Sequence, residues 1–386
     1  MDVARTPAIR RPVRFVTFVG FLTFISVPLL LTLVGLRPGA DDNRQPSPRP
    51  ALDARGLVDE QTYQQMDRYL QDSFALRGLA VRINAKLNDS VWKGDTDQVR
   101  RGKGDWLYYG PSLSQLCTEA MRPAEGVATL ERFASTIEAQ GARFVYTLAP
   151  EKSSVYPEYL TDRLATDGRC AVEAREEIRT GLAGQAWYVD LYPAVDELKA
   201  ESPEPIYHPR DTHWTEQGAG VLLERLVDTV RPGMWKSEEY TQVGTEPFEP
   251  DLTRLLGLGQ TIEAPRYVVA RPGITTTEGP ETPVAGTFPI RHFTSSADGA
   301  AGADLIPGKT VMLYDSFTIG SIPNLAPFFE DVTFVHWNAL GTIDLQAQLA
   351  GAETVIAEGA EREFTWRMRD KLAPTGLAGP AGARGS

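Results

Sequence analysis

Two short segments of the chain carry the residue types of a nucleophile and an acid–base pair. Asp211 and His213 lie two residues apart, and Ser316 follows an apolar run at residues 309–314 in a short turn. A carboxylate beside a histidine fixes which ring nitrogen carries the proton and leaves the other free as a base. A serine directly after a strand can expose its hydroxyl and direct backbone N–H groups at an oxyanion. These three residues could therefore act as nucleophile, base and orienting acid.

Simpler interpretations of the same residues stay open at this point. An Asp-x-His pair can cap a helix or make a buried polar contact, and a serine after a strand is often only a turn former. The sequence holds four histidines, so a histidine base must be His208, His213, His292 or His336. A metal site would need ligands beyond Asp211, His213 and the neighbouring His208. We therefore predict neither a metal nor a cofactor.

The segments around these residues alternate between strand and helix patterns. Helices are expected at 127–139, 172–182 and 215–230, the last with Thr215 as N-cap, and strands at 143–148, 186–191, 309–314, 333–336 and 354–357. Such alternation predicts a mostly parallel sheet with helices on both faces. Ligands of these folds bind beyond the carboxyl ends of the strands, which is where Lys152, His213 and Ser316 are expected.

Residues 15–36 form an uncharged apolar run, preceded by Arg5, Arg10, Arg11 and Arg14 and followed by acidic residues. About 20 apolar residues cross a hydrocarbon core of roughly 30 Å, and basic residues stay on the cytoplasmic side. We therefore expect an uncleaved signal-anchor, with the rest of the chain exported. A cleaved signal peptide is the main alternative, but its apolar region would be shorter and a small-residue cleavage site would follow.

These patterns divide the chain into five predicted parts. Residues 1–14 are cytoplasmic, 15–36 form the transmembrane signal-anchor, and 37–60 are a tether. Residues 61–373 form one α/β domain outside the cytoplasm, beginning with a helical pattern over 61–91. Within it, residues 237–308 are rich in Pro, Gly and Thr and are interpreted as a loop-rich insertion. Residues 374–386 are expected to be a disordered tail.

The composition limits the partners and the compartment. A formal net charge of -12 argues against nucleic-acid binding, which needs a basic surface. The only two cysteines, Cys117 and Cys170, are predicted to form a disulfide if the domain is exported. The alternative is two unrelated buried thiols.

The sequence resembles the SGNH-hydrolase-like polysaccharide O-acetyltransferases typified by the periplasmic alginate acetylation proteins. The resemblance is carried by DTHW at 211–214 and YDSF at 314–317, which are similar to that family's Asp-x-His-Trp and Gly-Asp-Ser-Phe blocks. Weaker similarity, in the family's order, lies at 74–78, 102–110, 149–159, 251–258 and 357–362. Tyr314 departs from the pattern, because the family has glycine there.

The resemblance implies an SGNH-hydrolase-like fold with permuted order, in which Asp211 and His213 precede the nucleophile Ser316. It implies a membrane-anchored enzyme that acetylates an extracytoplasmic polysaccharide through an acyl-serine. The partner it implies is a multi-pass membrane O-acyltransferase of the inner membrane, as part of exopolysaccharide biosynthesis. Lys152, Tyr314 and Trp214 are the expected substrate-binding residues.

Two other functions remain open from the sequence. The same three residues could remove acetyl groups as an esterase, since both reactions use an acyl-serine and differ only in the acceptor. The chain could also be a non-catalytic, glycan-binding component of an envelope complex. Tyr314 is the one feature that favours this second alternative.

Overall fold

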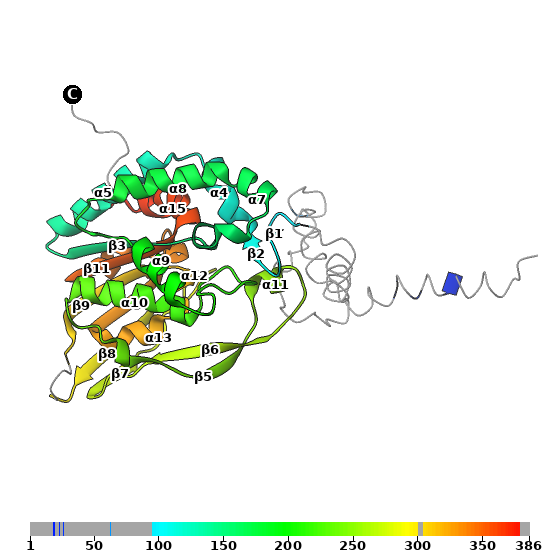
Figure 1. Ribbon diagram of the computed structural model, residues 1–386. Helices are drawn as coiled ribbons and strands as arrows, with labels where there is room; N and C mark the ends of the chain where they lie inside the picture. Colours follow the sequence, from blue (N-terminus) through cyan, green and yellow to red (C-terminus); the bar gives the residue numbers. More distant parts are fainter. Residues whose placement is uncertain are drawn as a thin grey trace, which may run out of the picture. The chain divides into compact units, whose positions relative to one another are not determined.

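The computed structural model describes residues 95–299 and 304–378, together with Phe18, Val19, Thr23, Ser26 and Thr62 (Figure 1). The chain forms two compact units, residues 1–94 with 254–259 and residues 95–253 with 260–386, and the second is described below. Apart from those five residues, the predicted cytoplasmic N-terminus, signal-anchor, tether and the helical pattern at 61–91 lie outside the described residues. Over the part of the chain that is described, no helix has the length and apolar character needed to cross a membrane.

A seven-stranded sheet runs through the second unit in the order β4-β3-β11-β9-β10-β8-β7. The first five strands in this order pair in parallel, whereas β8 and β7 pair antiparallel at one edge. The strands of this sheet are β3 (Arg143–Ala149), β4 (Tyr188–Val189), β7 (Ile274–Glu278), β8 (Arg291–Ala297), β9 (Ile306–Tyr314), β10 (Phe329–His336) and β11 (Thr354–Ala360). Two antiparallel pairs lie outside it: β1 (Val99–Arg101) with β2 (Leu107–Tyr109), and β5 (Tyr240–Phe248) with β6 (Ile262–Val269).

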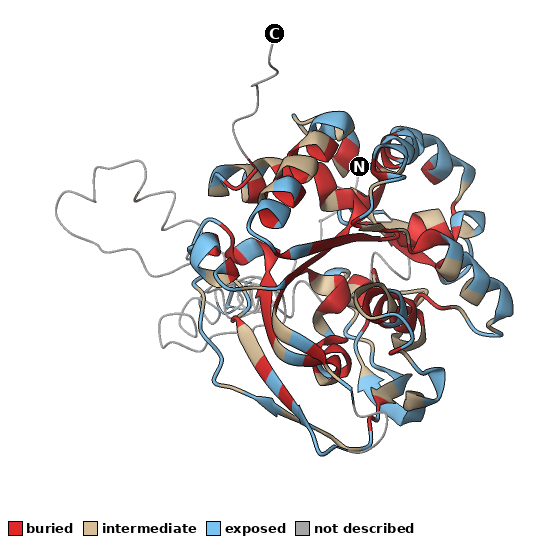
Figure 2. Ribbon diagram, turned by 90° about the vertical axis from the view of Figure 1, so that its left-hand side faces the viewer, coloured by how far each residue is buried: buried red, intermediate tan, exposed pale blue. Residues whose placement is uncertain are grey.

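Helices cover both faces of this sheet (Figures 1 and 2). One layer contains α5, α8 and α15, and the other contains α9, α10 and α13. The helices are α4 (Gln115–Thr118), α5 (Pro123–Ala139), α6 (Lys152–Val155), α7 (Asp162–Asp167), α8 (Arg169–Leu182), α9 (Tyr192–Glu201), α10 (Glu216–Val230), α11 (Asp251–Leu255), α12 (Ser316–Ile319), α13 (Ile322–Leu325), α14 (Leu345–Leu349) and α15 (Phe364–Trp366).

The alternation of side chains along the central strands builds one core on each face. On β9, Val311 and Leu313 join the core under α5 and α8, whereas Met312 and Tyr314 join the core under α10. Successive side chains of a strand point to opposite faces, so a strand buried on both sides is apolar at nearly every position. This is why the apolar runs at 309–314 and 354–357 correctly predicted central strands.

Helix α10 begins where the sequence analysis placed it. The Thr215 side chain accepts the backbone N–H of Gly218 at 3.1 Å, which confirms Thr215 as the N-cap. The apolar face of the helix buries residues such as Leu222 and Leu226 completely. The helix therefore fixes the loop that precedes it, which contains Asp211 and His213.

Two predicted segments contain more regular structure than their composition indicated. Residues 237–308, predicted to be a loop-rich insertion, include strands β5 to β8 and the start of β9. Strands β5 and β7 are mostly exposed, and β7 and β8 are rich in Thr and Ser, so these strands lack a continuous apolar pattern. The domain also extends past residue 373. Leu377 and Ala378 are buried in the core beside α5, and Arg132 donates to the Ala378 carbonyl at 2.6 Å.

The two cysteines are joined in the structure. Cys117 of α4 and Cys170 of α8, which are 53 positions apart in sequence, form a disulfide with Cα atoms 6.0 Å apart. Closing a loop of this size restricts the unfolded chain, so we expect reduction to lower the free energy of unfolding by about 4 kcal/mol. Urea unfolding with and without reductant measures this. The double Cys→Ala variant should unfold like the reduced protein, and equal midpoints for oxidised and reduced wild type would contradict the prediction.

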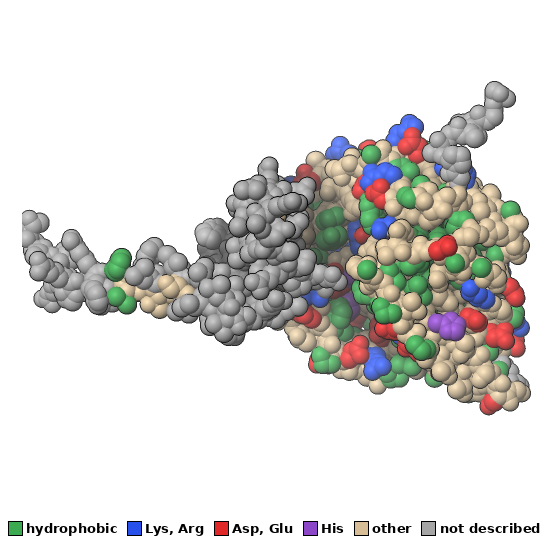
Figure 3. Space-filling model, turned by 180° about the vertical axis from the view of Figure 1, so that it is seen from behind, with side chains coloured by type: hydrophobic (Ala, Val, Ile, Leu, Met, Phe, Trp, Pro, Cys, Tyr) green, Lys and Arg blue, Asp and Glu red, His purple; other side chains and the backbone are tan. Residues whose placement is uncertain are grey.

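The surface carries charged side chains of both signs. On the face shown in Figure 3, acidic and basic side chains are interspersed among apolar ones, and the described residues form no extended basic patch there.

Candidate active site

Ser316 lies directly beyond the carboxyl end of β9, in a turn that its neighbour shapes. The Asp315 carboxylate accepts the backbone N–H of Phe317 at 2.8 Å, which caps the short helix α12 and leaves Ser316 as its first residue. The Thr318 N–H goes to the Asp315 carbonyl. The Ser316 N–H has no acceptor among the described residues. The turn thus presents a half-buried hydroxyl and one free backbone donor.

His213 faces this hydroxyl from the loop before α10. Its Nε2 lies 2.9 Å from Ser316 Oγ, and its Nδ1 lies 2.8 Å from Asp211 Oδ1. The same carboxylate oxygen accepts the His213 backbone N–H at 2.8 Å. The three residues singled out from the sequence are therefore brought together as a Ser–His–Asp triad, although 103 positions separate His213 from Ser316. In this geometry His213 can take the serine proton while Asp211 fixes its tautomer.

The charges of the triad favour that role. Burial alone would raise the pKa of Asp211, but its hydrogen bond to His213, the charge of His213 and the N–H of Asp251 hold that pKa below the usual range. Burial alone would lower the pKa of His213. The hydrogen bond and charge of Asp211, with the charge of Asp251, outweigh burial and raise the His213 pKa above its ordinary value of 6.5. Asp211 is thus ionised at neutral pH and can stabilise an imidazolium.

Lys152, predicted to bind substrate, is buried and hydrogen-bonded to the protein backbone, and its contact with a substrate stays a prediction. Its side chain is buried, and its Nζ donates to the carbonyls of His208 and Pro209 at 3.1 Å each and to the carbonyl of Asp211. Burial lowers the pKa of Lys152 to about 7, and the nearby carboxylates only partly oppose this. The role of Lys152 is to hold the backbone of the loop that carries the triad acid and base.

Replacing Lys152 with methionine keeps most of the buried side chain and removes its three hydrogen bonds. We expect kcat to fall roughly 10- to 100-fold with KM little changed, since small displacements of a base are costly for the chemical step. Steady-state kinetics with an acetyl ester measure this. A change confined to KM would instead show that Lys152 contacts the substrate.

Trp214 and Tyr314 are also structural in this geometry. Trp214 is buried and donates from its ring N–H to the Phe317 carbonyl at 3.0 Å, which ties the histidine loop to the serine turn. Tyr314 is 1% exposed, and its ring packs edge-on against Phe334 and His336 of the neighbouring strand. A tyrosine in the glycine position of the family block is therefore compatible with a formed triad. The substrate contacts predicted for both residues stay predictions.

A buried charge network beneath the triad was not predicted from the sequence. Asp315 accepts the Ala360 N–H at 2.7 Å and pairs with Arg367 at 2.7 Å, while Glu358 accepts the backbone N–H of Asp315 and the hydroxyl of Thr318. Burial and the charge of Asp315 raise the pKa of Glu358 well above its usual range. The network anchors the serine turn to β11.

A second buried pair lies beside the first. Arg362 pairs with Glu151 at 2.7 Å, and its guanidinium lies 5.5 Å from the centre of the Phe317 ring, which in turn contacts the His213 ring. The weak family similarity at 357–362 covers Arg362 and Glu358, but similarity alone gave them no role. Their charges become informative only once the fold buries them.

The carboxylate of Asp251 completes the surroundings of His213. Ligand atoms of Asp211, His213 and Asp251 lie within 4.8 Å of one another, a spacing that could also suit a metal ion. The same atoms already form the hydrogen bonds of the triad, since His213 Nδ1 and Asp211 Oδ1 are 2.8 Å apart. The arrangement therefore fits acid–base chemistry without further ligands.

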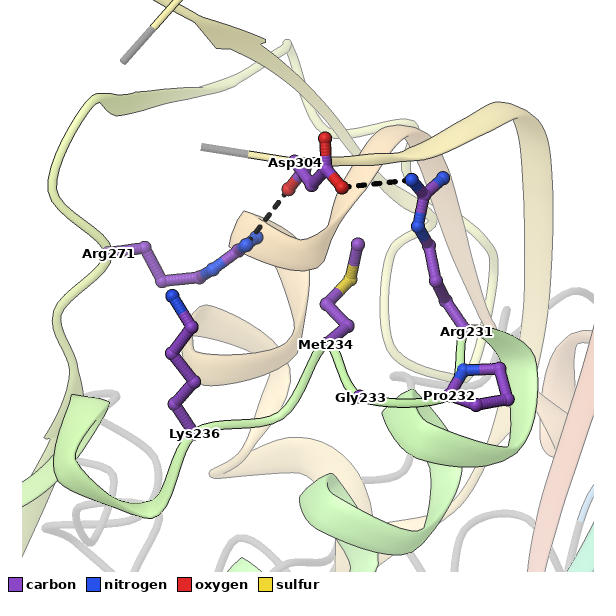
Figure 4. Close-up of a pocket in the computed structure, with 7 residues that line it drawn as sticks. All are labelled: Arg231, Pro232, Gly233, Met234, Lys236, Arg271 and Asp304. Atoms are coloured by element: carbon purple, nitrogen blue, oxygen red, sulfur yellow. Dashed lines mark hydrogen bonds and ion pairs between the residues drawn. The ribbon is translucent and has the colours of Figure 1, made fainter. Parts of the chain in front are cut away.

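A pocket of about 130 Å³ lies elsewhere in the domain, lined by Arg231, Pro232, Gly233, Met234, Lys236, Arg271 and Asp304 (Figure 4). Arg231 follows the end of α10, whereas the triad precedes its start, and 15 helical residues separate the two by roughly 22 Å. The cations of the pocket are already engaged: Arg231 pairs with Asp304 at 2.9 Å, and Arg271 donates to the Asp304 carbonyl at 2.8 Å. This pocket is not part of the candidate active site.

The comparisons with known proteins agree with this fold. Residues 99–287 match the model of the family described as the SGNH hydrolase-like domain of the acetyltransferase AlgX. This window includes Asp211 and His213 but ends before Ser316, so the place of the serine rests on the geometry. The mixed sheet between two helical layers is thus an SGNH-hydrolase-like α/β fold.

Individual relatives point the same way. A probable alginate O-acetylase AlgJ of Pseudomonas syringae pv. tomato is 24% identical over 197 residues, which are 50% of this chain and 50% of that protein. The chain thus spans about half the length of the curated relatives it matches. The structure of Bacillus cereus PatB1 with a sulfonyl adduct superposes with a TM-score of 0.52 at 11% identity, over 72% of this chain and 98% of PatB1.

The O-acetyltransferase domain of Pseudomonas putida AlgJ has a TM-score of 0.46 at 18% identity, over 74% and 99% of the two chains. The family match and the curated relatives named AlgJ, which match in sequence, confirm the resemblance inferred from the sequence. The chain is similar to the SGNH-hydrolase-like polysaccharide O-acetyltransferases of the AlgX and AlgJ type.

Proposed function

We propose that this chain is an O-acetyltransferase that moves acetyl groups onto hydroxyls of an extracytoplasmic polysaccharide through an acyl-serine. The observation that carries the proposal is the triad itself, in which His213 lies within hydrogen-bond distance of both Ser316 and Asp211. The relatives named alginate O-acetylases support the acetyl group and the polysaccharide as substrates.

The triad can perform both halves of such a transfer. His213 Nε2 takes the proton of Ser316 Oγ as that oxygen bonds to the carbonyl carbon of an acetyl ester. The leaving oxygen then takes this proton as its bond to the same carbon breaks. In the second half, an acceptor hydroxyl gives its proton to His213 while its oxygen bonds to the acetyl carbon. The proton returns to Ser316 Oγ as the acyl-serine bond breaks, and the Ser316 N–H is positioned to donate to the oxyanion in both steps.

We further propose that residues 15–36 anchor the chain in the inner membrane with the triad on the periplasmic or extracellular side. The uncharged apolar run and the arginines before it support this orientation. The Cys117–Cys170 disulfide also suits an oxidising compartment. Acetyl groups would then come from a multi-pass membrane O-acyltransferase, and the acceptor would be a polysaccharide that the cell exports.

The test uses the full-length chain in detergent with p-nitrophenyl acetate, with and without oligosaccharides of acidic and neutral sugars. Acetylated oligosaccharide, detected by mass spectrometry, is the expected product. Hydrolysis at a rate that no oligosaccharide changes would show an esterase. If the protein turns over no ester and a sulfonyl fluoride does not label Ser316, the proposed enzyme activity is wrong and the chain is a non-catalytic, glycan-binding component.

A further inference from the structure

Asp251 is a second carboxylate next to the triad, and the mechanism above does not use it. It is the first residue of α11 and lies 40 positions after Asp211 in the sequence. Its Oδ2 is 3.9 Å from His213 Nδ1, on the side of the ring away from Ser316, and its side chain is 21% exposed. Asp211, which contacts the same nitrogen at 2.8 Å, is almost fully buried. Two carboxylates therefore face the Nδ1 atom of the same imidazole.

Reciprocal hydrogen bonds join Asp251 to the loop that carries the triad. The backbone N–H of Asp251 donates to Asp211 Oδ2 at 2.5 Å, and Asp251 Oδ1 accepts the backbone N–H of Thr212 at 2.8 Å. Asp211 Oδ1 is occupied by the ring and the backbone N–H of His213. Both oxygens of Asp211 are thus held, and the peptide between Asp211 and His213 is fixed from the side of α11.

The loop is also held by Lys152, whose Nζ donates to the backbone carbonyls of His208, Pro209 and Asp211. Lys152 fixes carbonyl oxygens, while Asp251 fixes an N–H and the acid itself. The two side chains together leave the loop little freedom to rotate. Positioning by such outer groups is what keeps a base aimed at its nucleophile.

We propose that Asp251 is a positioning residue of the triad, which orients Asp211 and Thr212 and supplies a second negative charge behind His213 when the imidazolium forms. This inference deepens the proposed function and rests on it for its effect on catalysis. Asp251 does not touch Ser316 or the reacting atoms, so it acts through Asp211 and His213.

The charges that face His213 determine what removing the Asp251 charge does. Asp211 and Asp251 favour the imidazolium, whereas Arg362 opposes it. Burial lowers the pKa of the neighbouring His208 to about 4, so His208 is uncharged at neutral pH. Lys152 lies behind the loop, where the charges of Asp211 and Asp251 favour its protonated form. Neutralising Asp251 removes one of the two groups that raise the His213 pKa. The pKa of His213 must therefore fall, and the base becomes neutral at a lower pH.

The test compares Asp251→Asn with wild type in the full-length chain. The asparagine side-chain oxygen can still accept the Thr212 N–H, so this variant removes the negative charge and keeps the hydrogen bond to Thr212. We expect a lower His213 pKa in an NMR titration of the histidine ring protons. The midpoint of the pH dependence of Ser316 acylation should fall with it. Asp251→Ala also removes the acceptor of the Thr212 N–H and should reduce kcat roughly 10- to 100-fold with KM little changed.

Asp344→Asn is the matched control, because Asp344 is exposed and caps α14 through the Ala347 N–H at 3.1 Å, and it shares no hydrogen bond or ion pair with a triad residue among the described residues. Asp344→Asn should keep the wild-type His213 pKa and the wild-type midpoint of acylation. If Asp251→Asn gives the same two values as Asp344→Asn, the inference is wrong. The NMR titration needs no activity. A lowered His213 pKa in a protein whose Ser316 is never acylated would refute the proposed function and uphold the placement of Asp251.

Discussion

Alanine in place of Ser316 is expected to lower the rate of acetyl transfer by at least about 10⁴-fold, because triad members act as a unit and the serine supplies the attacking oxygen. Removing Oγ leaves His213 with no proton to take. Ser316 lies beyond the carboxyl end of β9 and its side chain is half-buried, so the substitution should leave the fold intact. The rate is measured with p-nitrophenyl acetate and an oligosaccharide acceptor.

Ser135→Ala is the matched control for this variant. Ser135 is exposed on α5 and donates only to the carbonyl of Glu131, one turn earlier in the same helix. It should keep the wild-type rate. If Ser316→Ala keeps that rate as well, the acyl-serine mechanism is wrong, and any transfer must proceed without this residue.

Replacing Arg367 with alanine should have the largest effect on stability. Arg367 is buried, pairs with Asp315 at 2.7 Å and also pairs with Glu363, while Glu358 lies in the same network. Removing one partner of a buried pair leaves an uncompensated charge, which costs about 3–5 kcal/mol of unfolding free energy. Asp315 also shapes the turn of Ser316, so activity should fall with stability. Urea unfolding, followed by circular dichroism, gives the difference.

The comparison for this prediction is Arg163→Ala. Arg163 pairs with Asp167 at 3.5 Å on the surface of α7, where its side chain is 73% exposed. Exposed pairs contribute little, because solvent screens the charges and ordering the side chains is costly. Equal losses of stability in the two variants would show that the buried network does not hold the serine turn.

Much of the fold could be predicted because the central strands are apolar on both faces. The runs at 309–314 and 354–357 became β9 and β11, and the Thr215 cap marked the start of α10. Strand β7 at the edge of the sheet and its neighbour β8 were missed because many of their residues are exposed and most are polar. An exposed Thr-rich strand and a loop have similar composition, so the pattern could not separate them.

The catalytic residues could be predicted for a different reason. Reactive side chains follow strand ends, and the carboxyl ends of parallel strands meet at one edge of the sheet. This brought Ser316 close to the loop of Asp211 and His213. The roles of Lys152 and Asp251 could not be predicted, because each depends on hydrogen bonds to a backbone that is distant in sequence. The sequence shows which side chains have groups that can bind a substrate. It does not show which of these groups already form hydrogen bonds within the folded protein.

The most direct test of the account is peptide mapping of the protein after a short incubation with p-nitrophenyl acetate in the absence of a sugar. We predict one added acetyl group on the peptide that contains Ser316, which disappears when an oligosaccharide acceptor is added and never forms in His213→Ala. An unmodified Ser316 peptide, or an acetyl group on it that forms equally in His213→Ala, would contradict the Ser316–His213–Asp211 mechanism.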